Sequence, residues 1–318
     1  MSPWTAADVP SMDGRIVIVT GANSGLGFEV TKVLAGAGAT VVMACRSVQR
    51  GESAATDVQE SIPDPDLDVR RCDLADLSSV ASFAEAFRGD YDDLHVLCNN
   101  AGVMAIPRQE TEDGFEMQLG VNHLGHFALT GRLLDRLVAT DGGTRVVTQS
   151  SGAHERGDVD FDDLHRERSY DAWEAYGQSK LANLLFAYEL QRRLDAAGID
   201  DTISVACHPG YAATNLQYRG PRQRESRLRY WGMKAANTLF AQSAERGALP
   251  MLYAATADGV GGGEYYGPDG FMHARGYPER QQSNDESYDE TRARRLWDVS
   301  EDLTGVEYDF ESLVAASA

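Results

Sequence analysis

Short, mostly apolar runs that are rich in β-branched residues recur along the first two thirds of the chain. They cover residues 16–20, 40–44, 67–72, 94–98, 145–148 and 203–207. Runs without a strict alternation of apolar and polar residues are typical of strands that are buried on both faces of a parallel sheet. The pattern therefore predicts one strand at each of these positions.

Segments with apolar residues at helical spacing separate these runs. In residues 25–37, for example, Leu26, Val30 and Leu34 fall on one helical face. Further helical segments are expected up to residue 61, around 80–87, and over 121–138 and 173–197. Alternating strands and helices predict an α/β fold. We expect a single-domain, Rossmann-type, doubly wound parallel sheet of about seven strands with helices on both faces.

The regular pattern weakens after residue 209. Residues 211–232 carry many Arg, Tyr and Gln side chains and follow a strand end, which is where α/β sheets bind their ligands. We expect a surface segment near the substrate; its aromatic residues could form a lid, and plain surface packing explains them equally well. Beyond it, the sequence predicts a helix over 233–257, a short strand after the glycines at 261–263, and a polar helix over 285–300.

The first predicted strand runs directly into a glycine-rich turn, Thr20-Gly21-Ala22-Asn23-Ser24-Gly25-Leu26-Gly27. Glycine permits a positive φ and a close approach of the backbone. The N-terminus of the following helix offers free N–H groups and a partial positive charge. A strand before this turn and a helix after it predict a binding site for the pyrophosphate of a dinucleotide. We expect contacts from Gly21, Asn23, Ser24, Gly25, Leu26 and Gly27.

The end of the second strand indicates which dinucleotide binds. NAD-binding sites place an acidic residue there, which binds the ribose 2′-hydroxyl, whereas this chain has Cys45-Arg46-Ser47. A guanidinium can pair with a 2′-phosphate that a carboxylate would repel. Arg46 therefore predicts NADP(H) as the cofactor. A solvated arginine is the alternative, and the missing acidic residue counts against it.

Two further features indicate where chemistry takes place. Tyr176 and Lys180 are four residues apart near the start of a long predicted helix and therefore share one helical face. An ammonium beside a phenol lowers the tyrosine pKa from about 10, so that Tyr176 could donate and accept a proton. The spacing alone is typical of a solvated helix face, and it gains weight from the glycine-rich turn upstream. Ser150 and Ser151 end the strand 145–148, where a hydroxyl could bind a substrate carbonyl or cap a helix.

The charge balance excludes several classes of partner. The 318 residues carry a formal net charge of −20, which repels nucleic acid and anionic membranes. No apolar run is long enough to cross a membrane and no secretory signal is evident, so we expect a cytoplasmic protein. An acidic surface with only three lysines, Lys32, Lys180 and Lys234, suits a high-salt interior. A halophilic host is therefore one hypothesis, and a GC-rich genome that favours arginine codons is the other.

No metal site is expected. The four cysteines, Cys45, Cys72, Cys98 and Cys207, lack metal-ligand spacing and lie in or near apolar runs. We interpret them as small buried hydrophobic residues. His123 and His126 are three residues apart, but no third ligand is apparent near them.

Five motifs in order resemble the short-chain dehydrogenase/reductase family. They are the glycine-rich turn 20–27, Asn99-Asn100-Ala101-Gly102, Ser151, Tyr176-x-x-x-Lys180 and Pro209-Gly210. The resemblance covers about residues 14–270. Residues 44–46, 150–154, 179–183 and 300–305 are most similar to the retinol dehydrogenase and protochlorophyllide reductase-like branch.

The resemblance implies a role for each matching residue. Tyr176 would be the acid/base group, Lys180 would bind the nicotinamide ribose and lower the Tyr176 pKa, and Ser151 rather than Ser150 would orient the carbonyl. Asn122 would hold a water that relays protons to Lys180. The remaining cofactor contacts that the family implies are Asp73 and Leu74 at the adenine, Asn99 at its ribose, Ala101 and Gly102 beside them, and Pro209, Gly210 and Thr214 at the nicotinamide.

We therefore expect an NADP-dependent oxidoreductase that transfers hydride between NADP(H) and the carbonyl or alcohol group of an apolar small molecule. A catalytically silent NADP(H)-sensing protein and a light-driven tetrapyrrole reductase are the alternatives. Residues 1–13 would form a lead segment, 14–284 the NADP-binding catalytic domain and 285–318 its C-terminal helical extension. Relatives imply a homo-oligomer, dimer or tetramer, although the extension could cover one interface.

Overall fold

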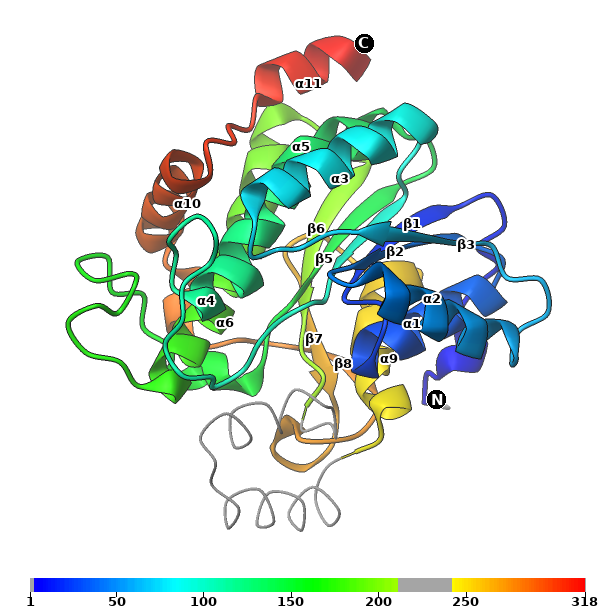
Figure 1. Ribbon diagram of the computed structural model, residues 1–318, viewed down its shortest axis with the longest axis horizontal. Coiled ribbons are helices and arrows are strands. Elements are labelled where there is room, and N and C mark those ends of the chain that lie inside the picture. The colour runs from blue at the N-terminus through cyan, green and yellow to red at the C-terminus, as the bar shows by residue number, and fades with distance from the viewer. Residues whose placement is uncertain (1–2, 211–241, 318) are drawn as a thin grey trace.

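A twisted sheet forms the centre of the computed structural model, which describes residues 3–210 and 242–317 (Figure 1). The strand order is β3-β2-β1-β4-β5-β6-β7-β8. The bounds are β1 (Ile16–Thr20), β2 (Thr40–Cys45), β3 (Leu67–Arg71), β4 (Val96–Asn99), β5 (Thr144–Gln149), β6 (Thr202–Cys207), β7 (Tyr265–Pro268) and β8 (Pro278–Gln281). Strands β1 to β7 pair in parallel, and β8 pairs with β7 in the antiparallel direction. The predicted Rossmann-type α/β fold is confirmed.

Helices cover both faces of the sheet, because successive side chains of a strand point to opposite faces. Val17 and Val19 belong to an apolar cluster with residues of α1, α2 and α9, whereas Ile18 between them belongs to a second cluster with residues of α3, α5 and α6. The bounds are α1 (Gly25–Gly36), α2 (Val48–Gln59), α3 (Leu77–Asp90), α4 (Met117–Leu119), α5 (Gly125–Ala139), α6 (Ala172–Ala197), α9 (Ala244–Thr256), α10 (Glu290–Thr304) and α11 (Phe310–Ser317). Shorter turns are η1 (Ala6–Asp8), the π-helical η2 (Gly120–Leu124), η3 (Gly152–Arg156), η5 (Phe271–His273) and η6 (Asp285–Tyr288).

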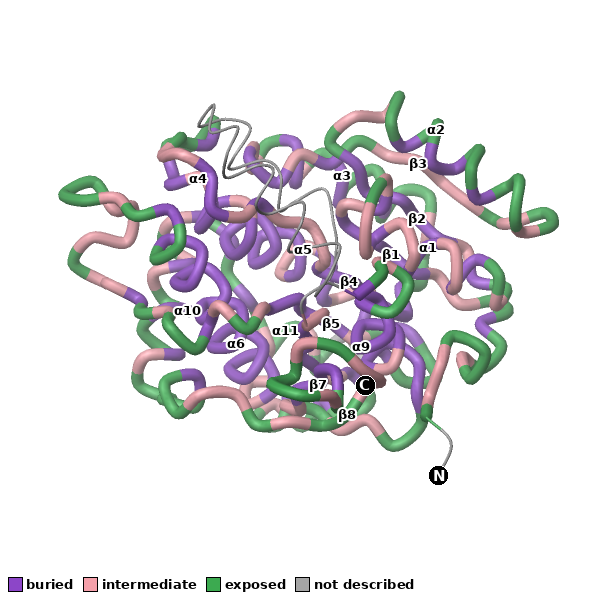
Figure 2. The backbone as a smooth tube through the Cα atoms, turned by 90° about the horizontal axis from the view of Figure 1, so that it is seen from below, coloured by how far each residue is buried: buried purple, intermediate pink, exposed green. Residues whose placement is uncertain are grey.

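The C-terminal helices belong to the same core as the sheet. Trp297 of α10 is only 1% exposed, and its ring lies 5.1 Å from that of Phe127 in α5 and 4.5 Å from that of Tyr308. The guanidinium of Arg193 in α6 lies 4.4 Å from the same indole. Figure 2 shows how α6, which α10 covers, is buried along most of its length.

Four details of the expected secondary structure differ from the structure. Strand β8 was not predicted, because Pro278–Gln281 is a short polar edge strand without an apolar run. The predicted helix over 285–300 is split at Asp289, whose carboxylate caps α10 by accepting from the N–H groups of Thr291 and Arg292. Helix α11 lies within the helical extension expected over 285–318, but a separate helix was not predicted there. In the described part of the helix expected over 233–257, α9 begins after Ser243; residues 233–241 and the segment 211–232 lie outside the described residues.

Membrane-spanning helices and metal sites are both absent from the described residues. None of the helices in residues 3–210 and 242–317 is both long and apolar enough to cross a lipid bilayer. Within the same residues, no three His, Cys, Asp or Glu side chains come together in a way that could hold a metal ion. All four cysteines are buried free thiols, and burial raises the pKa of the Cys45 thiol to about 11.

The order of the strands determines where a ligand can bind. The chain passes from β1 outward to β3 on one side and continues from β4 on the other side of β1. At such a reversal, the loops that follow the two adjacent strands diverge and leave a crevice at their carboxyl ends. The glycine-rich turn follows β1, and the turn at residues 100–102 follows β4, so both border this crevice.

Candidate active site

The glycine-rich turn and the turn after β4 are in close contact. Gly21 has φ +67°, and a Cβ atom there would lie 3.1 Å from the Cα of Ala101. A Cβ atom on Gly27 would lie 2.5 Å from the Gly21 carbonyl oxygen and 2.5 Å from Nδ2 of Asn100. The absence of side chains at Gly21 and Gly27 lets α1 begin directly against the turn. The free N–H groups at the start of α1 therefore border the crevice.

A pocket extends from this turn along the carboxyl ends of the strands. Ten of the residues predicted to bind the cofactor line it: Gly21, Asn23, Ser24, Gly25, Leu26, Arg46, Asp73, Leu74, Ala101 and Gly102. Gly27 lies behind them, in contact with Gly21. Pro209 and Gly210 follow β6 at the same end of the sheet, and Thr214 lies outside the described residues. The pocket thus has the glycine cradle and the helix N-terminus that a dinucleotide requires.

Asn99 does not lie in the pocket as expected, and Asn100 lines the pocket instead. The Asn99 side chain is fully buried and donates to the Thr130 hydroxyl at 3.0 Å, so it lies in the core and not in the pocket. Asn100 lines the pocket, and its Nδ2 donates to the Thr20 carbonyl at 2.8 Å. Strand β4 ends at Asn99. Successive side chains point to opposite sides, so Asn99 and Asn100 cannot both face the ligand. Where the strand ends was known only from the structure, and it decides that Asn100 is the one that does.

Arg50 is a second cation beside Arg46. Both guanidinium-bearing residues line the pocket together with Ser47. The Ser47 hydroxyl caps α2 by accepting from the N–H of Arg50 at 3.4 Å, so α2 begins at the edge of the pocket. Sequence reasoning missed Arg50, although the spacing Arg46-x-x-x-Arg50 across the start of a helix was a usable signal.

Tyr176, Ser151 and Lys180 come together next to this pocket, although none of the three is among the residues that line it. Tyr176 is 5% exposed, and its phenol hydrogen-bonds with the side chain of Ser151. Lys180 Nζ lies 5.8 Å from the centre of the Tyr176 ring and donates to the Gln149 carbonyl at 3.0 Å. A Cβ atom on Gly102, which lines the pocket, would lie 3.7 Å from the same Nζ.

The pKa of Tyr176 differs from the expectation. Burial raises the pKa of the phenol to about 12, and the hydrogen bond with Ser151 acts in the opposite direction. Burial also lowers the pKa of Lys180 to about 8. Desolvation penalises the charged form of both groups, and the ammonium is bonded to Gln149 rather than to the phenol oxygen. The predicted lowering of the Tyr176 pKa by Lys180 is therefore not found in the protein alone.

Asn122 lies in the π-helical turn η2, between the pocket and α6. Its Oδ1 accepts from the N–H of Val103 at 2.8 Å, and its Nδ2 donates to the Val103 carbonyl at 3.0 Å and to the Ser179 hydroxyl at 2.9 Å. Ser179 in turn donates to the Tyr176 carbonyl at 2.8 Å. Single π-turns are frequent at functional sites, and this one brings the predicted relay residue into the hydrogen-bond network of the tyrosine helix.

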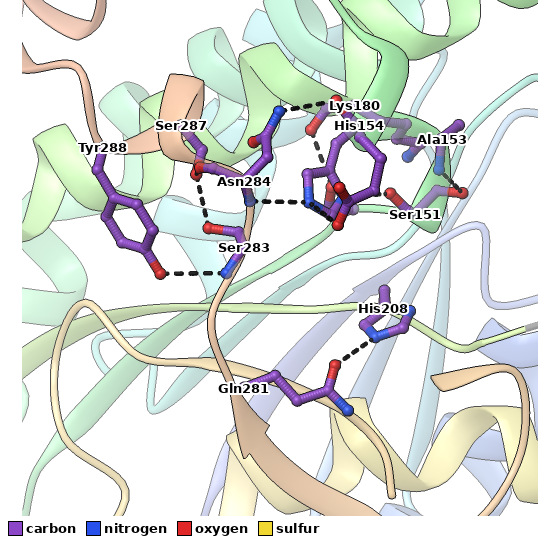
Figure 3. A network of polar contacts seen from close by, with 12 residues as sticks. Ser151, Ala153, His154, Lys180, His208, Gln281, Ser283, Asn284, Ser287 and Tyr288 are labelled. Atoms are coloured by element: carbon purple, nitrogen blue, oxygen red, sulfur yellow. Dashed lines mark hydrogen bonds and ion pairs between the residues drawn. The ribbon is translucent and has the colours of Figure 1, made fainter. Parts of the chain in front are cut away.

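A clamp from the C-terminal part of the chain holds the turn that contains Ser151. His154 Nδ1 donates to the Ser151 carbonyl at 2.7 Å, and its Nε2 accepts from the N–H of Asn284 at 3.4 Å. Asn284 Nδ2 donates to the His154 carbonyl at 3.2 Å (Figure 3). Nearby, His208 Nε2 lies 2.9 Å from Oε1 of Gln281. The segment after β8 therefore holds the backbone turn that carries the Ser151 side chain in place.

Comparisons with known proteins agree with this geometry. Residues 15–225 match the family model described as short chain dehydrogenase. The chain is 41% identical to human retinol dehydrogenase 11 over 97% of this chain and 92% of that protein. It is also 41% identical to human retinol dehydrogenase 13, over 93% of this chain and 86% of that protein. A crystal structure of an uncharacterised protein from Mycobacterium paratuberculosis is 43% identical, covers 97% of this chain and 100% of that one, and has a TM-score of 0.80.

These matches include the glycine-rich turn, Ser151, Tyr176 and Lys180, and they confirm the resemblance inferred from the motifs. The protein is therefore an oxidoreductase that acts on the alcohol or carbonyl group of a small molecule and uses a nicotinamide cofactor. The chain belongs to the short-chain dehydrogenase family, in its retinol dehydrogenase-like branch.

Proposed function

We propose that this protein is an NADP(H)-dependent reductase or dehydrogenase in which Tyr176 transfers the proton. One observation carries the proposal: Gly102 lines the cofactor pocket and at the same time abuts Lys180, so that the pocket leads directly to the tyrosine and lysine. The absence of a side chain at Gly102 leaves room beside Nζ at this junction. A cofactor held along the pocket would thus extend to the groups that handle protons.

NADP(H), when bound, supplies or accepts the hydride. The chain's own residues would do the rest. The Ser151 hydroxyl would orient the carbonyl oxygen, and the Tyr176 phenol would give its proton to that oxygen as negative charge develops on it. The Lys180 ammonium would stabilise the phenolate that remains. In the alcohol-oxidising direction, the phenolate would take the proton back.

The preference for NADP(H) over NAD(H) rests on Arg46 and Arg50. Two guanidinium groups, the Ser47 hydroxyl and the start of α2 border the pocket at the end of β2. A 2′-phosphate would find charge-assisted hydrogen bonds there. The pocket-lining residues that follow β2 include no carboxylate, and Asp73, which also lines the pocket, follows β3 instead.

The substrate is proposed to be apolar. Trp173 is 54% exposed although it is a large aromatic residue, and its ring lies 6.1 Å from that of Tyr176 in an edge-on arrangement. An exposed indole beside the reacting phenol offers an apolar contact surface. The relatives are named retinol dehydrogenases, and a long apolar alcohol or aldehyde fits the same description.

Tyr176→Phe and Tyr188→Phe test the proposal as a pair. Both tyrosines are buried on α6, but the Tyr188 hydroxyl bonds Ser283 instead of Ser151. NADPH oxidation with a panel of aldehydes and ketones should fall by about 10²- to 10⁴-fold in Tyr176→Phe, with NADPH binding retained, and should stay near wild type in Tyr188→Phe. Full turnover by Tyr176→Phe would refute the acid/base role. No comparison supports a silent sensor, and any turnover with this panel would exclude one.

A further inference from the structure

His126 contacts both the cofactor turn and the predicted proton-relay residue. It is the second residue of α5 and is 1% exposed. Its Nε2 lies 2.9 Å from Oγ1 of Thr20, which begins the glycine-rich turn. Its Nδ1 lies 3.0 Å from the main-chain carbonyl oxygen of Asn122. The sequence suggested His126 only as an incomplete metal ligand, and the described residues form no metal cluster around it.

The partners of His126 determine its tautomer. A carbonyl oxygen can only accept, so Nδ1 carries the hydrogen that is donated to Asn122. The Thr20 hydroxyl oxygen already accepts from the N–H groups of Asn100 and Ala101, both at 2.9 Å. Its own proton is therefore free to be donated to Nε2, with the Cys98 carbonyl at 3.2 Å as the more distant acceptor. Burial lowers the pKa of His126 to about 4, which keeps the ring neutral.

The hydrogen bonds continue from Asn122 to the helix of the catalytic pair. Asn122 Nδ2 donates to the Ser179 hydroxyl, and Ser179 donates to the main-chain carbonyl of Tyr176. A single connected network thus runs from Thr20 at the pyrophosphate turn through His126, Asn122 and Ser179 to Tyr176. Networks of buried hydrogen bonds in which every member is paired hold their side chains in one arrangement.

We propose that His126 is a positioning residue that couples the cofactor turn to the proton-transfer residues. Its Nε2 accepts from the Thr20 hydroxyl, and its Nδ1–H donates to the main-chain carbonyl of Asn122, the residue expected to hold the relay water. This inference rests on the proposed function. His126 does not itself line the described pocket, so it acts through Thr20 and Asn122 rather than on the cofactor or the substrate.

His123 provides a matched control in the same stretch of helix. It is also 1% exposed, and its Nε2 lies 2.9 Å from the Ser300 hydroxyl of α10. Because Ser300 donates its proton to the Leu296 carbonyl at 2.7 Å, it accepts from Nε2–H of His123. The two histidines are thus equally buried but in opposite tautomers, and His123 faces the C-terminal extension instead of the cofactor turn.

Replacing His126 with asparagine or with glutamine should remove its two hydrogen bonds one at a time. The amide nitrogen of asparagine can take the place of Nδ1, and the amide of glutamine can reach the place of Nε2. His126→Asn should keep the hydrogen bond to the Asn122 carbonyl and lose the one with the Thr20 hydroxyl. The Kd for NADPH should then rise about tenfold, while kcat at saturating NADPH stays within about threefold of wild type. His126→Gln should do the reverse, with kcat reduced about tenfold and Kd nearly unchanged. His123→Asn and His123→Gln should lower only the unfolding temperature.

The tautomers themselves give a readout that does not depend on activity. In ¹⁵N-histidine-labelled wild-type protein, NMR should find the His126 proton on Nδ1 and the His123 proton on Nε2, each signal being assigned by its loss in the corresponding variant. A proton on Nε2 of His126, or His126 variants that change only stability as the His123 variants do, would overturn the proposal. Failure of the proposed function would look different, because Tyr176→Phe would retain turnover while the Kd effect of His126→Asn persisted.

Discussion

Ser150 and Ser151 are adjacent at the end of β5, yet their hydroxyls face different partners. Ser150 is 1% exposed, and its Oγ donates to the main-chain carbonyl of Lys180 at 2.8 Å. This hydroxyl therefore stabilises the contact between the end of β5 and α6. The Ser151 side chain accepts from the N–H of Ala153 and hydrogen-bonds with the phenol of Tyr176. The geometry therefore favours Ser151 as the hydroxyl that meets the substrate.

Ser151→Ala should reduce kcat by about 10²-fold or more, because the transition state loses a preorganised donor. Ser150→Ala should retain turnover and lower the free energy of unfolding by about 1 kcal/mol, the contribution of one buried hydrogen bond. Steady-state kinetics and chemical denaturation of both variants measure these effects. The reverse result, with the larger loss of turnover in Ser150→Ala, would reassign the role.

The pH dependence of reduction should show the titration of Lys180. Burial lowers its pKa to about 8, whereas the phenol of Tyr176 keeps its proton up to about 12. The ammonium is therefore present below pH 8 and is lost as the pH rises through that value, so kcat/KM for NADPH, which reports the free enzyme, should fall above about pH 8. Lys32→Gln should leave this profile unchanged, and Lys180→Arg should remove the decline from whatever activity remains. A level profile between pH 6 and 10 would contradict the assignment.

Cofactor preference should depend on both arginines beside the pocket. Arg46→Ala and Arg50→Gln should each raise the KM for NADPH by about 10- to 100-fold, since each loses a charge-assisted hydrogen bond, and should change the KM for NADH little. Arg71→Gln at the end of β3 removes the same charge from a residue that does not line the described pocket. Equal losses with NADPH in all three variants would indicate a general effect of charge rather than recognition of the 2′-phosphate.

The C-terminal extension should contribute strongly to stability. Trp297→Ala removes a fully buried indole that contacts Phe127, Phe186 and Tyr308, and we expect the free energy of unfolding to drop by about 3–5 kcal/mol. Trp173→Ala, which removes an exposed indole, should cost far less. Denaturant titrations of the two variants give the comparison, and a Trp297→Ala protein as stable as Trp173→Ala would show that α10 is not part of the cooperative core.

Local motifs were predictable because their meaning depends on short spacings. The glycine-rich turn needs only a strand, a few residues without side chains and a helix, all within residues 16–36. Tyr176 and Lys180 need only the period of one helix to share a face. The order of these segments along the chain gave the resemblance to the family. That resemblance in turn predicted the fold, the cofactor pocket, and the pair Tyr176 and Lys180.

Only the tertiary structure decided which residues of these segments contact one another. It turned Asn99 into the core and Asn100 to the pocket, bonded Lys180 to Gln149, and added β8 as a polar edge strand. It also placed His126 against Thr20, which lies 106 residues earlier in the chain. Contacts of this kind depend on the packing of distant segments and on the direction of single hydrogen bonds, neither of which leaves a period or a spacing in the sequence.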